Sequence, residues 1–319
     1  LDLGETAQLF WEEANRVPQA SFSSDAPEIV PVDTLGQISG KAEGTAHITI
    51  TSENRQTFVT RVEVGRGLSV RREKAVMMFT GDIMCAVKHQ RLAYGHQHDY
   101  FDSFRRVRDI LSGADFTAGV LETTSIDRAP FEFEQLRLLT GAPNCNSPST
   151  FISAVAAAGF NAVVTANNHN SDCGVEGLKA ADSEIRRCGM LNIGSMGHSL
   201  VMTDVKGIKV AVIATTMITN NTGWDLSKSG LVNPAGIYSR DYFTELVNSA
   251  RRMGAEFIAA YQHWGSMNSP RIRKDQAEEA QFMADAGADL IVGSHPHMVQ
   301  RFSYIGAADG RLVPCAYSL

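Results

Sequence analysis

Long hydrophobic runs, paired cysteines and an excess of basic residues are all missing from this sequence. The apolar runs at 151–160 and 210–218 fall well short of the ~20 residues that cross a bilayer, so we expect no membrane-spanning segment. The five cysteines contain no CxxC pair, which argues against a disulfide framework and against a thiolate zinc site. The net charge is -6 and Lys and Arg are scattered, so we expect no nucleic-acid partner.

The composition that is present describes a folded chain. Hydrophobic residues make up 44% of the 319 positions, enough to bury the core of one large domain or two smaller ones. The chain begins at Leu1 with neither a methionine nor a signal-peptide pattern, and it stops inside an apolar run. We therefore expect a fragment of a longer protein, truncated at its C-terminus.

Residues 1–73 predict a small, mostly β N-terminal extension. Apolar residues at helical spacing over 7–17 predict one amphipathic helix. Alternating apolar residues at 46–50 and 58–64 predict a β-hairpin that turns at 52–55, and 68–70 predicts a third short strand. Because no set of catalytic residue types occurs here, we expect a structural or partner-docking role.

Residues 74–319 predict an α/β domain, because short apolar runs alternate with helical patterns. The predicted strands are 75–80, 117–121, 162–166, 191–193, 257–261 and 290–292, with a hairpin over 200–214. The predicted helices are 101–112, 148–158, 175–187, 241–253 and 275–286.

Polar side chains of metal-binding type directly follow five of these strands. They are Asp82, Glu122, the pair Asn168 and His169, His263, and the pair His295 and His297. In α/β folds, loops at the carboxyl ends of different strands meet at one site. A mixed set of carboxylate, amide and imidazole groups suits Mn²⁺, Fe²⁺ or Zn²⁺. The sequence therefore predicts a divalent-metal centre.

Six motifs occur in a fixed order over this domain. They are GDIM at 81–84, LE at 121–122, ANNHNSDCG at 166–174, HWG at 263–265, GADLIVGSHPHMVQ at 287–300 and the terminal YSL. With these motifs the chain resembles the CapA family of poly-γ-glutamate capsule biosynthesis proteins, in the calcineurin-like metallophosphoesterase superfamily. The resemblance implies a four-layer α/β metallophosphatase-like sandwich with its metal centre at strand ends.

The resemblance also implies a role for each matching residue. The implied metal ligands are Asp82, Glu122 as the bridging acid, Asn168, His263, His295 and His297. In a phosphoesterase the metal would activate a water, and His169 would donate a proton to the leaving oxygen. Asp172 would then orient His169.

The first motif departs from the superfamily pattern. Met84 stands where a histidine is usual, and Glu122 alone represents the second motif. A thioether is a poor ligand for Mn²⁺ or Zn²⁺, so we expect one weak site or a single-ion centre. The segment 94–98 contains two histidines, and it supplies the missing imidazole, contacts the substrate or forms a surface loop.

Three basic residues follow the HWG motif. Arg271, Arg273 and Lys274 either hold carboxylates or phosphates of a substrate or form a solvated turn before the next helix.

Three functions stay open at this point. The leading hypothesis is a metal-dependent, phosphoesterase-type hydrolase that serves the biosynthesis of capsule or another cell-surface polymer, with an anionic polymer or phosphoester as substrate. The second is a non-catalytic, polymer-binding component of a membrane-bound capsule synthesis or export complex. The third is a metal-dependent peptide epimerase-type enzyme in which His169 acts as the acid/base residue. The compartment is also open, because CapA relatives sit outside the membrane on an N-terminal anchor, whereas unpaired cysteines fit a reducing interior.

Overall fold

The computed structural model describes residues 1, 3–4, 6–9, 21–34, 36–51, 57–65, 74–128, 131, 145–220 and 225–319. Residue contacts divide the chain into two compact units, Leu1–Lys74 and Ala75–Leu319. None of the helices in these described residues has the length and apolar character needed to span a membrane.

The first unit is built from two small antiparallel sheets. Strand β1 (Thr6–Gln8) pairs with β3 (Gln37–Ser39), and β4 (Gly44–Thr51) lies between β2 (Ser21–Ser24) and β5 (Thr57–Val64). The β4–β5 pair confirms the predicted hairpin. The predicted helix over 7–17 is wrong at its start, because residues 7 and 8 pair with β3. Its remainder, the turn at 52–55 and the strand at 68–70 lie outside the described residues.

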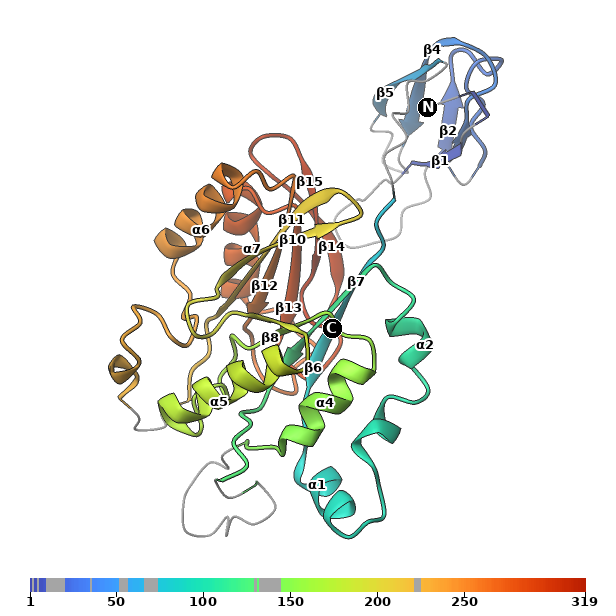
Figure 1. Ribbon diagram of the computed structural model, residues 1–319. Coiled ribbons are helices and arrows are strands. Elements are labelled where there is room, and N and C mark those ends of the chain that lie inside the picture. The colour runs from blue at the N-terminus through green and yellow to red at the C-terminus, as the bar shows by residue number, and fades with distance from the viewer. Residues whose placement is uncertain are drawn as a thin grey trace. The chain divides into compact units, whose positions relative to one another are not determined.

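The second unit contains two sheets that pack face to face (Figure 1). A parallel sheet has the order β6-β7-β8-β9, and a mixed sheet has the order β10-β11-β12-β13-β15-β14. The parallel strands are β6 (Met77–Ile83), β7 (Phe116–Leu121), β8 (Ala162–Val164) and β9 (Leu191–Ile193). The mixed-sheet strands are β10 (Leu200–Val205), β11 (Ile208–Thr216), β12 (Phe257–His263), β13 (Leu290–Ser294), β14 (Phe302–Gly306) and β15 (Leu312–Ala316).

Helices cover the outer face of each sheet, which completes the predicted four-layer sandwich. The parallel sheet carries α1 (Val87–Tyr94), α2 (Arg108–Leu111), α4 (Ser149–Ala157) and α5 (Gly174–Arg187), together with the 3₁₀ helix η1 (Tyr100–Ser103). The mixed sheet carries α6 (Arg240–Arg252) and α7 (Lys274–Ala286), and a second 3₁₀ helix, η3 (Leu226–Ser229), precedes α6. The apolar faces of these helices are buried against the sheets, which removes their surface from water.

The core between the sheets fixes how the strand ends face one another. It is made of small and β-branched side chains such as Ala118, Val164 and Val212, all buried. The hydroxyl of Tyr261 on β12 crosses this layer and donates to the backbone oxygens of Thr80 and Ala118, at 3.1 and 3.0 Å. These contacts join β12 of one sheet to β6 and β7 of the other.

One predicted helix is wrong in extent. The pattern at 101–112 predicts a single helix, but the chain forms η1, then turns over 104–107, and only then forms α2. The Asp99 side chain accepts from the backbone N–H of Phe101 and starts the 3₁₀ helix. Apolar spacing alone does not distinguish a continuous helix from two short turns that bury the same face.

Candidate metal centre

All six predicted metal ligands lie at the carboxyl ends of strands, and the two sheets contribute together. Asp82 belongs to β6, and Glu122 directly follows β7. From the mixed sheet, His263 ends β12 and His295 directly follows β13. The backbone N–H of His295 donates to Asp82 Oδ2 at 3.1 Å, so the two sheets touch at the site itself.

Glu122 is the most unusual residue of the group. Its side chain is fully buried, and neither carboxyl oxygen accepts a hydrogen bond from the described part of the chain. Oε1 lies 3.8 Å from His263 Nε2, and Oε2 lies 3.8 Å from His297 Nδ1. Burial, and then the charges of Asp82 and Asp172, raises the pKa of Glu122 to about 9. A buried carboxyl group without a partner is costly, which indicates that a cation satisfies it.

Asp82 reaches the same space from β6. Its Oδ2 lies 3.1 Å from His297 Nδ1, and its buried Oδ1 accepts no hydrogen bond from a described residue. The register of β6 against β7 shifts between Phe79 and Asp82, so the strand is irregular just before the site. Gly81 is required there, because a Cβ at this position would lie 2.2 Å from the backbone oxygen of Leu319.

His263 and His295 have lowered pKa values, which favours the neutral form that ligates metals. His263 Nδ1 contacts Ser294 Oγ at 2.9 Å, which leaves Nε2 facing Asn168 Oδ1 at 2.8 Å. Burial, with the neighbouring His295 and His297, holds the pKa of His263 well below its usual value. Burial and His297 also lower the pKa of His295 to about 4.

The donor set fits a divalent cation. Glu122, His263 and His295 offer ligand atoms within 4.8 Å of one another, and so do Asp82, Glu122 and His297. Glu122 belongs to both groups, as a bridging carboxylate would. Unpartnered oxygens of Asp82 and Glu122 and an unpartnered Nδ1 of His295 point to the same conclusion, among the residues the structure describes. Carboxylate and imidazole ligands suit borderline and hard divalent ions.

His169 and Asp172 form a hydrogen-bonded pair beside this cluster. His169 Nδ1 lies 2.7 Å from Asp172 Oδ2, which also accepts from the backbone N–H of Cys145 at 2.7 Å. The carboxylate fixes Nδ1 as the protonated nitrogen and leaves Nε2 for proton transfer. The potential ligand atoms of Cys145, His169 and Asp172 also lie within 4.8 Å of one another. The short contact between His169 and Asp172 already occupies one atom of each of these two residues.

Sequence reasoning missed the residues that hold this arrangement. Asn167 donates to the backbone oxygen of Leu121 at 2.9 Å and accepts from the backbone N–H of His169 at 3.0 Å. Asn170 donates to two backbone oxygens, and Ser294 contacts His263. Asn170 and Asn167 lie in the ANNHNSDCG motif, but only the folded structure separates these two structural amides from Asn168.

The three predicted substrate cations differ from one another. Arg273 forms a two-pronged pair with Asp275 at 2.9 Å, and Lys274 pairs with Glu278 at 3.3 Å. Arg271 is exposed and makes no ion pair with a residue the structure describes. Its backbone oxygen accepts from Gln300 Nε2 at 3.1 Å.

That hydrogen bond places the loop of Arg271 beside the His-Pro-His turn. Asn268, three residues earlier, donates its backbone N–H to the oxygen of Pro296 at 2.7 Å. Of the three cations, Arg271 is therefore the one without an ion pair among the described residues, and its backbone lies in the loop that contacts this turn.

One histidine of segment 94–98, His98, contacts residues outside the cluster. His98 Nε2 lies 2.8 Å from Ser103 Oγ, and its ring stacks with His89 at 6.0 Å. The segment lines a surface pocket beside α1 and η1, and neither of its histidines joins a metal-type cluster within the described residues. The structure therefore gives no support to a metal-ligating role for this segment, and substrate contact and a surface loop both stay predictions.

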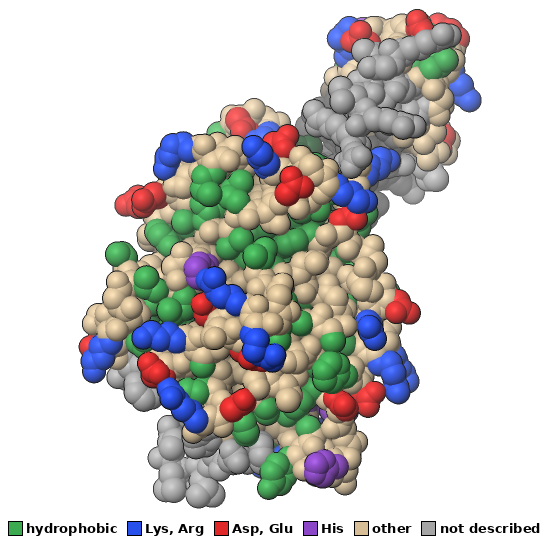
Figure 2. All heavy atoms as spheres, viewed as in Figure 1, with side chains coloured by type: hydrophobic (Ala, Val, Ile, Leu, Met, Phe, Trp, Pro, Cys, Tyr) green, Lys and Arg blue, Asp and Glu red, His purple; other side chains and the backbone are tan. Residues whose placement is uncertain are grey.

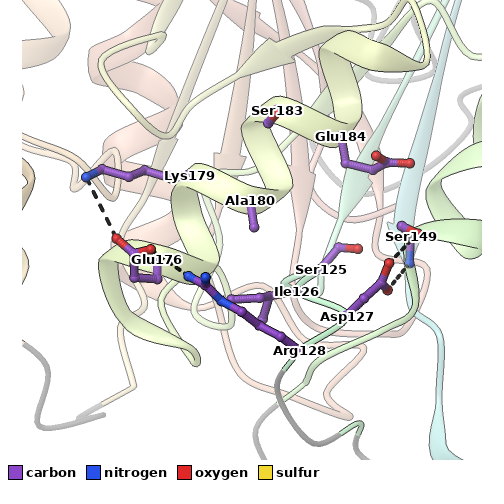
Figure 3. A pocket seen from close by; sticks show the side chains of 10 residues that line it. All are labelled: Ser125, Ile126, Asp127, Arg128, Ser149, Glu176, Lys179, Ala180, Ser183 and Glu184. Carbon is purple, nitrogen blue, oxygen red and sulfur yellow. Dashed lines mark hydrogen bonds and ion pairs between the residues drawn. The ribbon is translucent and has the colours of Figure 1, made fainter.

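A separate pocket of about 540 Å³ opens between α5 and the residues that follow Glu122 (Figure 3). Two of its charged groups form an ion pair, Arg128 with Glu176 at 2.7 Å, and Asp127 accepts a hydrogen bond from Ser149 Oγ at 2.7 Å. None of the predicted site residues lines it. The face of the molecule in Figure 2 likewise shows Lys and Arg interspersed with Asp and Glu.

The layered fold and the buried cluster define an α/β sandwich protein with a candidate metal centre at its strand ends. The chain belongs to the bacterial capsule synthesis protein PGA_cap family, whose model matches residues 76–319.

Two relatives are capsule biosynthesis proteins. The chain is 27% identical over 266 residues to the capsule biosynthesis protein CapA of Bacillus anthracis, covering 77% of this chain and 60% of that protein. It is 26% identical over 235 residues to the PGA biosynthesis protein CapA of Bacillus subtilis strain 168, covering 70% and 57%. The chain thus spans about three fifths of the length of these relatives.

Solved structures are more distant. The calcineurin-like phosphoesterase YfkN from Bacillus subtilis is 12% identical, with a TM-score of 0.34 over 63% of this chain and 64% of that one. Because this overlap is low, the fold class rests on the strand order and layers described above.

Proposed function

We propose that this chain is a metal-dependent hydrolase of the phosphoesterase type that serves the biosynthesis of poly-γ-glutamate capsule or another cell-surface polymer. Membership of the capsule synthesis family supports the biological setting. The observation that best supports the chemistry is the side chain of Glu122. Its two buried oxygens accept no hydrogen bond from a described residue and face His263 and His297, one from each of the two metal-type groups. The His169–Asp172 pair next to this cluster supplies a proton donor.

The proposed cofactor is Mn²⁺, Fe²⁺ or Zn²⁺, and two groups that share Glu122 favour two ions. Bound metal would supply Lewis-acid stabilisation of phosphoryl oxygens and lower the pKa of water. Asp172 holds the His169 ring and stabilises its protonated form, and His169 Nε2 gives a proton to the leaving oxygen. Arg271 holds an anionic group of the substrate at the rim of the site.

The proposed substrate is an anionic polymer or a phosphoester, and a membrane-bound capsule synthesis complex is the proposed partner. A non-catalytic, polymer-binding role is the second candidate. Met84 favours it, because a thioether in place of an imidazole leaves one metal group with fewer suitable ligands.

The test is metal-dependent turnover by the purified chain. Bis(p-nitrophenyl) phosphate and p-nitrophenyl phosphate are offered with Mn²⁺ or Zn²⁺ and again after chelation. We expect turnover that chelation abolishes and that His169→Ala reduces at least a hundredfold, with metal content by mass spectrometry unchanged.

His47→Ala is the matched control. His47 also pairs with an aspartate, Asp25 at 3.0 Å, but it belongs to the first unit. We expect this variant to keep full turnover. Bound metal without turnover of either ester, together with retention of poly-γ-glutamate on the immobilised chain, would instead support the binding role.

A further inference from the structure

Asn220 follows β11, a strand whose end carries none of the predicted site residues, and its side chain contacts Asn168 and His169 beside the metal centre. It lies four residues beyond the end of β11, next to β12 in the mixed sheet. The backbone N–H of Met217 donates to the oxygen of His263 at 2.9 Å, and Thr216 Oγ1 bonds both the N–H and the oxygen of Ile218. These contacts hold the segment against the end of β12, so the position of Asn220 is defined by the backbone before it.

The carboxamide of Asn220 contacts two neighbouring residues of the ANNHNSDCG motif. Its Oδ1 accepts from Asn168 Nδ2 at 3.3 Å, and its Nδ2 lies 3.4 Å from His169 Nδ1. His169 Nδ1 already has a closer partner, Asp172 Oδ2 at 2.7 Å. The main hydrogen bond of the Asn220 side chain is therefore the one that its Oδ1 accepts from Asn168 Nδ2.

The orientation of the Asn168 amide decides whether it can bind a cation. Only the carbonyl oxygen is a metal ligand, because the NH₂ end has donors and no lone pair to offer. In the structure Oδ1 faces His263 Nε2 at 2.8 Å, on the cluster side, and Nδ2 faces Asn220. A rotated amide would place two N–H donors against the cations and lose the acceptor at Asn220.

We propose that Asn220 is a positioning residue that fixes the carbonyl oxygen of Asn168 toward the metal centre. This inference rests on the proposed metal-dependent function. Asn220 touches Asn168 and His169 and acts on the metal through Asn168. Outer hydrogen-bond partners of this kind change metal affinity by roughly 10–100-fold when they are removed.

The experiment is a double-mutant cycle read out as Mn²⁺ affinity, from the EPR signal of free Mn²⁺. The four proteins are the 319-residue chain, Asn220→Leu, Asn168→Ala and the double variant. We expect Asn220→Leu to weaken Mn²⁺ binding about tenfold alone, and less than about twofold in the Asn168→Ala background. Asn233→Leu is the control, because the Asn233 side chain bonds only the backbone of Ile237 within the described residues and should leave Mn²⁺ affinity unchanged.

Three outcomes separate the ideas. Equal losses in both backgrounds would overturn the inference, because Asn220 would then act independently of Asn168. Unchanged affinity in Asn220→Leu, with normal binding by the original chain, would overturn it as well and leave the metal centre standing. No Mn²⁺ or Zn²⁺ binding by the original chain would refute the metal centre, and the role of Asn220 with it.

Discussion

Replacing Glu122 by glutamine should change how the stability of the metal-free protein depends on pH. The folded protein raises the pKa of Glu122 from 4.5 to about 9, chiefly by burial. Between these values the folded state keeps a proton that the unfolded chain releases. Stability is therefore highest below the unfolded pKa and falls as the pH rises through the folded pKa. Glutamine keeps the shape of the protonated acid and removes this titration.

The magnitude follows from the shift. His263 and His295 have lowered pKa values, so they add a slope of the opposite sign only below their unfolded value of 6.5. Above it, Glu122 dominates at about 1.4 kcal/mol per pH unit. From about pH 6.5 to about pH 8.5 the metal-free protein should lose roughly 2.5 kcal/mol of stability, and Glu122→Gln should lose far less.

Urea unfolding with a chelator present, followed by tryptophan fluorescence at each pH, measures this difference. Trp264 is fully buried in the second unit, so its fluorescence reports unfolding of that unit. Glu176→Gln, at an exposed glutamate paired with Arg128, is the control and should keep the slope of the original chain. Equal slopes for Glu122→Gln and the original chain would refute the argument. Mn²⁺ should stabilise the original chain and not Glu122→Gln, because the variant lacks the shared carboxylate.

Three further predictions concern catalysis, binding and packing. Asp172→Asn should lower turnover roughly a hundredfold with unchanged metal content by mass spectrometry, because an amide does not stabilise the protonated imidazole. Arg271→Ala should raise the KM for an anionic polymer about tenfold with kcat unchanged in steady-state assays, whereas Lys274→Ala should not, because that lysine already pairs along its helix. Gly293→Ala should lower the free energy of unfolding by more than ~2 kcal/mol in urea, since its Cβ would lie 2.0 Å from the Tyr317 backbone oxygen.

The alternation of apolar runs and helical patterns was sufficient to predict an α/β domain, whereas the four-layer arrangement was implied by the resemblance to the capsule synthesis family. Five strands that carry site residues occur within a few residues of their predicted positions. Strand β14 was not predicted, because its buried and exposed residues alternate over only five positions at the edge of a sheet. Residues 6–8 form a strand only through pairing with 37–39, and no local pattern contains that information.

The candidate site was predictable only in part, because the strand-end positions of its ligands are visible in the sequence but their supporting contacts are not. The sequence shows that Glu122 and His263 come at the ends of predicted strands, and the carboxyl ends of parallel strands lie close together. The supporting contacts depend on distant residues, and a serine or asparagine looks the same in sequence whether or not it faces a cluster. Ser294 is 31 residues from His263, and Asn220 is 52 residues from Asn168.

The centre depends on the packing of the two sheets as much as on its ligands. Asp82 and Glu122 come from the parallel sheet, and His295 and His297 follow β13 of the mixed sheet. The two histidines have φ angles of 95° and 53°, which L residues adopt at a cost of about 1–3 kcal/mol each. The hydrogen bond from the backbone N–H of His295 to Asp82 Oδ2 helps to offset that cost. It can form only while the two sheets are packed against each other as in this structure. A cation bound between these groups would add to the same interface, so metal affinity and the stability of the sandwich are expected to be thermodynamically linked.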